Sequence, residues 1–354
     1  MPTYYEERLQ KDLSWIQQLV AIVGTAVVNG IDDAVRSVLT LDKDLAAATV
    51  LGDLTINRQT RELDRLCHVF VARHLPSAGH LRYVSSVLRL GIALERMGDY
   101  ATTMSRTAAQ LSAPAPQVVA HDLEMMARHA HRMLRDGLRS FDARDAVLAR
   151  ATLTTASQFT QHFDKVFADL VDEGEARTRP VTDLFALMAT FNRLERVIHQ
   201  AKNICEETIF VATGRAKGEK VYELLFVDES NSGASLLAEH FTRKNFPASG
   251  RYRSAGWHPA EETDASYVEF AHTVGLDLAE SWPKPLAAQR EQLDDFHFLV
   301  GLGVGARERI GPVPFHTTVL EWPVDVAAPP DAVYRALAPR IRELMEQLRG
   351  EQAS

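Results

Sequence analysis

LGIALERMGDYATTM, residues 90–104, decides how the N-terminal part of this chain folds. Its apolar residues recur at spacings of three and four, which is the period of an amphipathic α-helix. A second segment, TFNRLERVIHQAKNI at residues 190–204, matches it at an offset of 100 residues and shares the Leu-Glu-Arg triplet. Repetition at a fixed offset indicates an internal duplication, with each copy forming one structural unit.

The two segments lie in a region, residues 1–212, whose helical period continues almost throughout. Breaks rich in Gly, Pro, Asn and Asp divide this region into long helices. We expect six of them, at residues 5–29, 43–73, 80–111, 116–139, 145–173 and 180–211. Three helices per copy predict two tandem three-helix bundles, at about residues 1–113 and 114–212.

The period changes after a Gly- and Lys-rich linker at residues 213–219. Apolar runs that predict strands alternate from there with helical patterns. The expected strands are 220–227, 250–256 and 296–303, and the expected helices are 235–246, 267–276 and 333–350. Such alternation predicts a small parallel α/β domain at residues 220–354. The fold class is therefore α plus α/β.

The composition is that of a soluble globular protein, with 46% hydrophobic and 24% charged residues. A net charge of −8 argues against non-specific binding of nucleic acid. No uninterrupted apolar run reaches the roughly 18 residues needed to span a bilayer, and the N-terminus lacks a signal-peptide pattern. We therefore expect a cytoplasmic chain without membrane insertion. Cys67 and Cys205 are expected to be buried free thiols.

Acidic residues continue the apolar face of the third predicted helix. Glu95 and Asp99 lie one turn apart on one stripe, and Asp53 lies on the preceding helix. Two acids at this spacing can converge on one cation, and inward acids in a helical bundle are a known way to build metal sites. Solvated surface ion pairs are the alternative interpretation of the same spacing. The corresponding stripe of the sixth helix carries Glu195, His199 and Glu206.

The duplicated helices also carry a family signature. LERMGDYA at 94–101 and LERVIHQAKNICEETIFVATG at 194–214 resemble the repeats of the PhoU family of bacterial phosphate-uptake regulators. The resemblance covers about 210 residues. It implies bound metal ions, with Glu95 and Asp99 as first-repeat ligands and Asp53 as a helper from the facing helix. It also implies docking on the ATPase of the phosphate ABC transporter and on its partner sensor histidine kinase.

The second repeat departs from this pattern. Glu195 matches the signature, but the Gly-Asp pair of the family is replaced by Ile198–His199. The counterpart of Asp53, near Thr155–Ser157, contains no acid. Histidine ligates zinc, iron or nickel well and magnesium poorly, so the second site is expected to be weaker or to favour softer metals. The sequence leaves the metal open among iron, zinc, nickel and magnesium.

A second resemblance starts at FVDESNSGAS, residues 226–235. Backbone amides at a strand–turn–helix junction of this kind form an anion cradle. The segment resembles the Val-Cys-x-x-Asn-x-x-Arg-Ser loop of low-molecular-weight protein tyrosine phosphatases and arsenate reductases, over about 130 residues with RYRSAGWHP and GLDLAESWPKPL. The nucleophilic Cys position holds Asp228, however, and the Arg position holds Ala234. The degenerate anion loop comprises Asp228, Asn231, Ser232, Ala234 and Ser235.

Phosphatase chemistry of this type needs a thiolate nucleophile and an Arg that clamps the phosphate oxygens. Because both are missing, we expect a pseudo-phosphatase recognition domain in which Asp228 itself accepts the loop amides. The resulting hypothesis is a non-enzymatic, metal-binding adaptor in phosphate-starvation signalling. Two alternatives remain: an active phosphatase or arsenate reductase with a helical regulatory half, and a redox or metal-storage bundle. The sequence leaves the oligomeric state open, a homodimer included.

Overall fold

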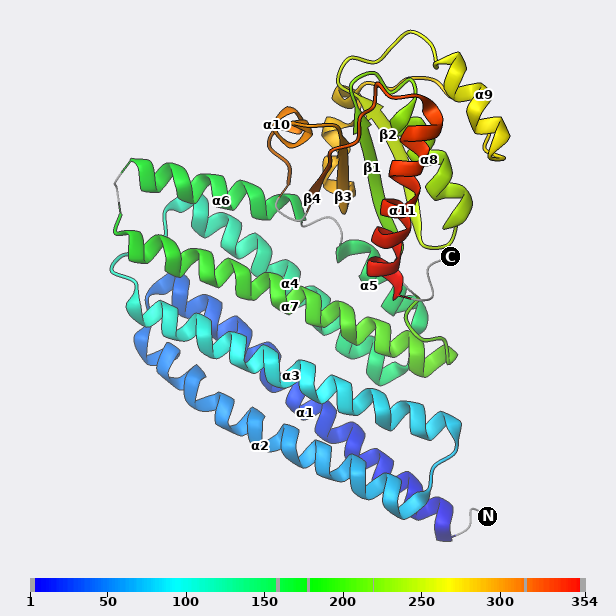
Figure 1. Cartoon of the computed structure of the whole chain (residues 1–354). Coiled ribbons are helices and arrows are strands. Elements are labelled where there is room, and N and C mark those ends of the chain that lie inside the picture. Colours follow the sequence, from blue (N-terminus) through cyan, green and yellow to red (C-terminus); the bar gives the residue numbers. More distant parts are fainter. Residues whose placement is uncertain (1–3, 157–159, 177–178, 219, 315–316, 351–354) are drawn as a thin grey trace. The chain divides into compact units, whose positions relative to one another are not determined.

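The computed structural model describes residues 4–156, 160–176, 179–218, 220–314 and 317–350. The chain divides into two compact units, Met1–Gly218 and Glu219–Ser354 (Figure 1). Each unit has its own apolar core, and the two are described separately.

In the described residues of the first unit, every secondary-structure element is a helix, as the 3.6-residue period predicts. The helices α1, α2 and α3 pack on one another as one bundle, and α4, α5, α6 and α7 form the second. Contacts between α3 and α7, the two helices with the Leu-Glu-Arg triplet, join the bundles. This arrangement confirms the two tandem bundles. The bounds are α1 Tyr4–Thr40, α2 Lys43–His74, α3 Ala78–Gln110, α4 Gln117–Ala143, α5 Ala146–Ala156, α6 Thr160–Glu175 and α7 Val181–Thr213.

Local signals end several of these helices. Asp42 caps α2, since its carboxylate accepts a 2.9 Å hydrogen bond from the backbone N–H of Leu45. Gly214 ends α7 in the left-handed conformation, at φ 72°, which glycine adopts without a Cβ penalty. The helix expected at residues 145–173 is described as α5 and α6, and residues 157–159 between them lie outside the described residues.

The break expected at Asn29–Gly30 is wrong, because α1 continues without interruption to Thr40. Glycine inside a helix costs only about 1 kcal/mol relative to alanine. Continued burial offsets this cost, since the apolar face persists after Gly30 with Ile31, Ala34, Val35 and Val38, which are all buried.

The length of α1 has a second consequence. Its most apolar window has a mean hydropathy of 1.3, so by length and composition alone α1 could cross a membrane. Polar and charged residues interrupt this helix, so it contains no uninterrupted apolar run of about 18 residues, as expected. One face of α1, from Leu9 to Val38, is buried in the helical core, which is the arrangement of an amphipathic bundle helix.

The second unit is a four-stranded parallel sheet in the order β2-β1-β3-β4, which confirms the small parallel α/β domain. The strand β4 was not predicted, because its five residues are partly exposed at the sheet edge and show weak alternation. The bounds are β1 Tyr222–Asp228, α8 Ala234–Asn245, β2 Gly250–Gly256, α9 Ala265–Thr273, the 3₁₀ helix η2 Leu286–Asp295, β3 Phe298–Leu302, α10 Ala306–Ile310, β4 Thr318–Trp322 and α11 Pro330–Arg349.

Helices cover both faces of the sheet. Leu224 and Phe226 of β1 pack into a core with residues of α8, α9 and α11, whereas Leu225 and Val227 pack against η2 and α10. This double burial explains why β1 is a continuous apolar run. The strand β1 ends at Asp228 beside β3, and the connections after these two strands run to opposite sides, from β1 to β2 and from β3 to β4. Ligands of open parallel sheets bind at such a switch point.

Candidate functional site

Asp53 is the most deeply buried acid of the predicted metal stripe, with 9% of its surface exposed. Its Oδ2 accepts a 2.8 Å hydrogen bond from the Asn57 side-chain amide one turn further along α2. Its Oδ1 is buried and has no hydrogen-bond partner among the residues that the structure describes. A buried carboxylate oxygen without a partner is costly, so this atom is a candidate ligand.

Asp53 lies directly over Gly98 of the signature helix α3. A Cβ atom at Gly98 would lie 2.6 Å from Asp53 Oδ1 and 3.3 Å from the Ile56 Cγ2 methyl. The glycine of Leu-Glu-Arg-x-Gly-Asp therefore lets a carboxylate of the neighbouring helix approach the backbone of α3. No role was predicted for Gly98, although a glycine inside a strongly periodic helix is a recognised signal of close packing.

The three first-repeat acids influence one another electrostatically. Glu95 is half-buried and Asp99 is exposed. Burial and then the charge of Asp99 raise the pKa of Asp53. Loss of hydration raises the pKa of Glu95, and the charges of Asp99 and Asp53 raise it further. A bound cation would relieve this repulsion.

To bind one metal ion, the acidic side chains must also lie close enough to reach a common point. Among residues 4–156, 160–176, 179–218, 220–314 and 317–350, no group of three or more His, Cys, Asp or Glu side chains lies close enough to hold a metal ion. Asp53, Glu95 and Asp99 fit a hard cation in donor chemistry and in the unpaired Asp53 Oδ1. Their side chains would have to turn toward one another for all three to ligate.

The second-repeat residues are spread along α7. Glu195 is half-buried, and His199 is exposed one turn later. Loss of hydration lowers the pKa of His199, and the negative charge of Glu195 partly opposes this by raising it. Glu206 instead forms an ion pair with Lys217, at 2.8 Å. Glu206 follows Glu195 by eleven positions of helix, which is about 16 Å, so these two do not share one ion.

The loop after β1 is filled by its own carboxylate. Asp228 is 3% exposed, and its two oxygens accept hydrogen bonds from the backbone N–H groups of Asn231, at 2.5 Å, and Ser235, at 2.8 Å. Burial raises the pKa of Asp228, while these amides oppose the rise. The amides that would hold an anion are thus occupied from within the chain.

The other loop residues support this arrangement. Asn231 adopts the left-handed conformation, at φ 49°, and its side-chain amide donates to Ser235 Oγ at 2.7 Å. Its Oδ1 accepts the backbone N–H of Lys284 at 2.8 Å, which ties the loop to the segment after α9. Ser232 Oγ lies 2.7 Å from Ser230 Oγ, and Ala234 begins α8 as a buried residue.

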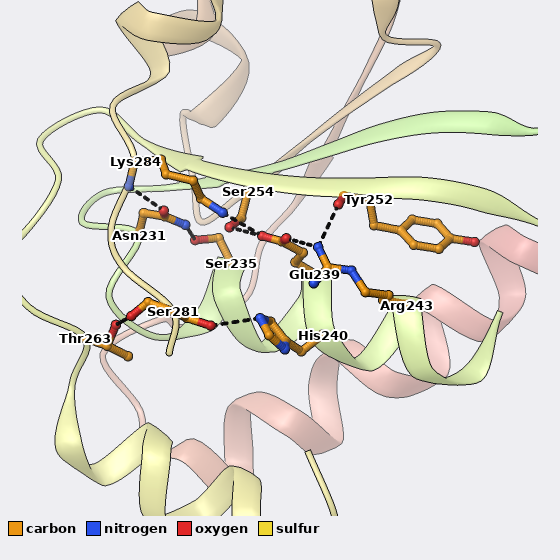
Figure 2. A network of polar contacts seen from close by, with 10 residues as sticks. All are labelled: Asn231, Ser235, Glu239, His240, Arg243, Tyr252, Ser254, Thr263, Ser281 and Lys284. Carbon is orange, nitrogen blue, oxygen red and sulfur yellow. Dashed lines mark hydrogen bonds and ion pairs between the residues drawn. The ribbon is translucent and has the colours of Figure 1, made fainter. Parts of the chain in front are cut away.

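A buried glutamate connects the loop helix with the sheet. Figure 2 shows Glu239 of α8 between Arg243 and Lys284. Its carboxylate also accepts a 2.5 Å hydrogen bond from Ser254 Oγ of β2, and Lys284 Nζ lies 2.9 Å from Glu239 Oε2. This network was not predicted from the sequence, because its members are far apart in the chain. Its polar groups satisfy one another, which indicates a structural role.

The expected thiols are present in the first unit. Cys67 and Cys205 are free and buried. Both therefore lie outside the loop of the second unit, where a phosphatase nucleophile would be needed.

Comparison with known proteins supports the first resemblance. The model of the PhoU domain matches residues 20–108 and 123–208. The phosphate-specific transport system accessory protein PhoU of Escherichia coli is 26% identical over 204 residues, covering 58% of this chain and 85% of that protein. Its homolog in Pseudomonas putida is 26% identical over 212 residues, covering 60% of this chain and 83% of that protein. The crystal structure of PhoU from Pseudomonas aeruginosa has 25% sequence identity and a TM-score of 0.56, covering 58% of this chain and 99% of that chain.

Two solved structures align with the second unit. The Corynebacterium glutamicum thioredoxin-dependent arsenate reductase is 24% identical with a TM-score of 0.32, covering 37% of this chain and 63% of that chain. The tyrosine phosphatase Wzb from Escherichia coli K30 is 20% identical with a TM-score of 0.32, covering 36% and 99%.

The two ranges matched by the PhoU domain model fall on the two helical bundles, one range on α1 to α3 and one on α4 to α7. Each range contains one copy of the Leu-Glu-Arg triplet, at Leu94–Arg96 and Leu194–Arg196. The helical unit of this chain therefore belongs to the PhoU family.

Proposed function

We propose that this protein regulates phosphate uptake and phosphate-starvation signalling as a non-enzymatic adaptor in the cytoplasm. Its partners in this proposal are the ATPase of the phosphate ABC transporter and the associated sensor histidine kinase. The observation that carries the proposal is the pair of PhoU domains, whose relatives are named as accessory proteins of phosphate-specific transport. A pull-down of the transporter ATPase with the full chain tests it, and absence of binding in both metal-loaded and chelated protein would contradict it.

Metal binding is the second part of the proposal. Asp53, Glu95 and Asp99 would hold a cation, supported by the unpaired Asp53 Oδ1 and by the raised pKa values of Asp53 and Glu95. When bound, the ion supplies positive charge that offsets the repulsion among the three carboxylates. An all-oxygen donor set favours magnesium or iron at this site, whereas His199 beside Glu195 would favour zinc, iron or nickel in the second repeat.

Elemental analysis of the purified chain tests the metal site. The wild type is expected to carry metal in stoichiometric amount, and Glu95→Ala with Asp99→Ala is expected to lose it. The matched control is Glu7→Ala with Asp44→Ala, two exposed acids outside the cavity that Glu95 lines, which should retain the metal. A wild type without metal would show that the stripe is a polar surface. Bound iron that cycles with oxygen would favour the metal-storage alternative.

The third part is that the second unit recognises a partner without catalysis. It is supported by Asp228, which occupies two amides of the loop with its own carboxylate. A phosphate in contact with Asp228 would meet a like charge in a buried site, which is unfavourable.

An aryl phosphate assay separates this proposal from the active-phosphatase alternative. No turnover above background is expected, and turnover would overturn the proposal. Asp228→Ala should free the amides, so that phosphate or arsenate raises the melting temperature of the variant but not of the wild type. Asp228→Asn, which keeps the side chain in place, is the control. Tight oxyanion binding by the unmodified chain would contradict the self-filled loop.

A further inference from the structure

A long groove runs between α1 and α4 of the helical unit. It consists of two cavities of about 800 Å³ and 430 Å³, which share His131 and Arg135 in their linings. Along α1 the linings extend from Val20 to Thr40. Twenty residues of α-helix span about 30 Å, so the groove is as long as a helix of five to six turns.

One wall of the groove is an arginine stripe, defined as Arg128, Arg132, Arg135 and Arg139 of α4. Their spacings of four, three and four place all four guanidinium groups on one face of the helix. Arg128 has an acidic neighbour, Glu124, at 3.4 Å. The other three are exposed, and no ion pair joins any of them to an acid within the part of the chain that the structure describes.

The floor of the groove is apolar. The side chains that form it belong to both helices and are buried or half-buried: Val20, Val28, Val35, Leu39, Ala127 and Leu138. An apolar strip beside a row of guanidinium groups matches a helix with one apolar face and one acidic face. Arginine suits such a contact because its planar fork can bind a carboxylate through two parallel hydrogen bonds.

Acids within the same linings decide between two classes of partner. Asp32 lies 2.9 Å from His131 Nδ1, and Asp136 and Asp142 also line the cavities. A polyanion such as DNA would meet these carboxylates along its backbone, and it has no apolar face for the floor. A protein helix can place its acids opposite the arginines alone.

We infer that the α1–α4 groove binds an amphipathic, acidic helix of a partner protein, with carboxylates on Arg132, Arg135 and Arg139. The inference rests on the proposed function, because it gives the chemistry of a partner that an adaptor would recognise. The apolar face of the partner helix packs on the floor between Val28 and Leu39, and its acidic face meets the arginine stripe.

A binding measurement on the full chain tests the inference. The probe is a fluorescein-labelled helical peptide of about 18 residues, built from Leu on one face and Glu on the other. Anisotropy at about 0.15 M ionic strength should show binding by the wild type. The variant Arg132→Glu, Arg135→Glu, Arg139→Glu should weaken binding at least about 100-fold, because each lost charge-assisted contact contributes about tenfold.

A matched triple variant distinguishes an effect of the groove arginines from an effect of the total charge of the chain. Arg8→Glu, Arg58→Glu and Arg150→Glu change the same total charge at exposed positions outside the groove. This control should bind within about twofold of wild type at this ionic strength. Circular dichroism confirms that both triples are folded.

Three outcomes would overturn the inference: no binding by the wild type, equal losses in both triples, or arginine-dependent binding of duplex DNA tighter than of the peptide. A scrambled peptide of the same composition, which lacks the apolar face, should bind at least about tenfold more weakly. The pull-down of the transporter ATPase and the metal analysis are independent of the peptide assay. Failure of the groove is therefore distinguishable from failure of the proposed function.

Discussion

Gly98→Ala is the substitution whose effect the structure defines most sharply. In an ordinary helix interior this change stabilises by about 1 kcal/mol, because glycine loses more backbone freedom on folding. At Gly98 the new methyl would lie 2.6 Å from Asp53 Oδ1 and 3.3 Å from Ile56 Cγ2. Asp53 cannot turn away freely, since its other oxygen accepts the hydrogen bond from Asn57.

The size of the effect follows from these contacts. Overpacking a close helix–helix contact costs about 1–3 kcal/mol, part of it here the lost hydrogen bond to Asn57. After subtraction of the helix-propensity gain, Gly98→Ala should destabilise the chain by about 0–2 kcal/mol. In the Asp53→Ala background the closest contact is gone and only the contacts with the Ile56 side chain remain, so the same substitution should stabilise by up to about 1 kcal/mol. The expected coupling between the two positions is thus about 1–3 kcal/mol.

Urea unfolding of the four chains, wild type, both single variants and the double variant, measures the coupling. Far-UV circular dichroism follows mainly the helical unit, because that unit holds most of the helix. Chelator is present throughout, so that loss of a metal does not enter the comparison. A coupling below about 0.5 kcal/mol, or stabilisation by Gly98→Ala in the wild-type background, would refute the close approach of Asp53.

Three further predictions concern buried groups. Because burial raises the pKa of Asp53, the metal-free Asp53→Asn chain should be more stable than wild type at neutral pH. Melting curves between about pH 3 and 8 measure this difference. The advantage should vanish below pH 3.8, the ordinary pKa, where the wild-type carboxyl is protonated in both the folded and the unfolded chain. An advantage that persists in acid would contradict it. Glu239→Gln leaves Lys284 without its carboxylate and should destabilise the second unit by about 2 kcal/mol in urea, and an unchanged unfolding midpoint would contradict this. Burial raises the pKa of Cys67 and of Cys205 to about 12, so a thiol reagent at about pH 8 should label neither until denaturant is added, and rapid native labelling would contradict the burial.

The helical fold was predictable because its signals are local and repeated. The period around Leu-Glu-Arg predicts each signature helix, and the 100-residue offset predicts the duplication. The helix end predicted at Asn29–Gly30 was wrong because it depends on tertiary packing and not on a local signal. Whether a helix continues through a weak helix former depends on what its later residues pack against, and Ile31 and Val38 pack into a core built by other helices. The edge strand β4 was missed for a similar reason, since pairing with β3 defines it.

The residue pattern alone predicts the candidate groups: an acidic stripe in each signature helix, and Asp228 and Ala234 at the positions where the resemblance expects a phosphatase nucleophile and its arginine. How those groups are satisfied depends on the tertiary structure. It leaves Asp53 Oδ1 unpaired over Gly98, pairs Glu206 with Lys217, and places the Asp228 oxygens on two loop amides. The physical reason is that a residue's identity sets its charge and its donors, whereas burial and partners depend on segments brought together from distant parts of the chain.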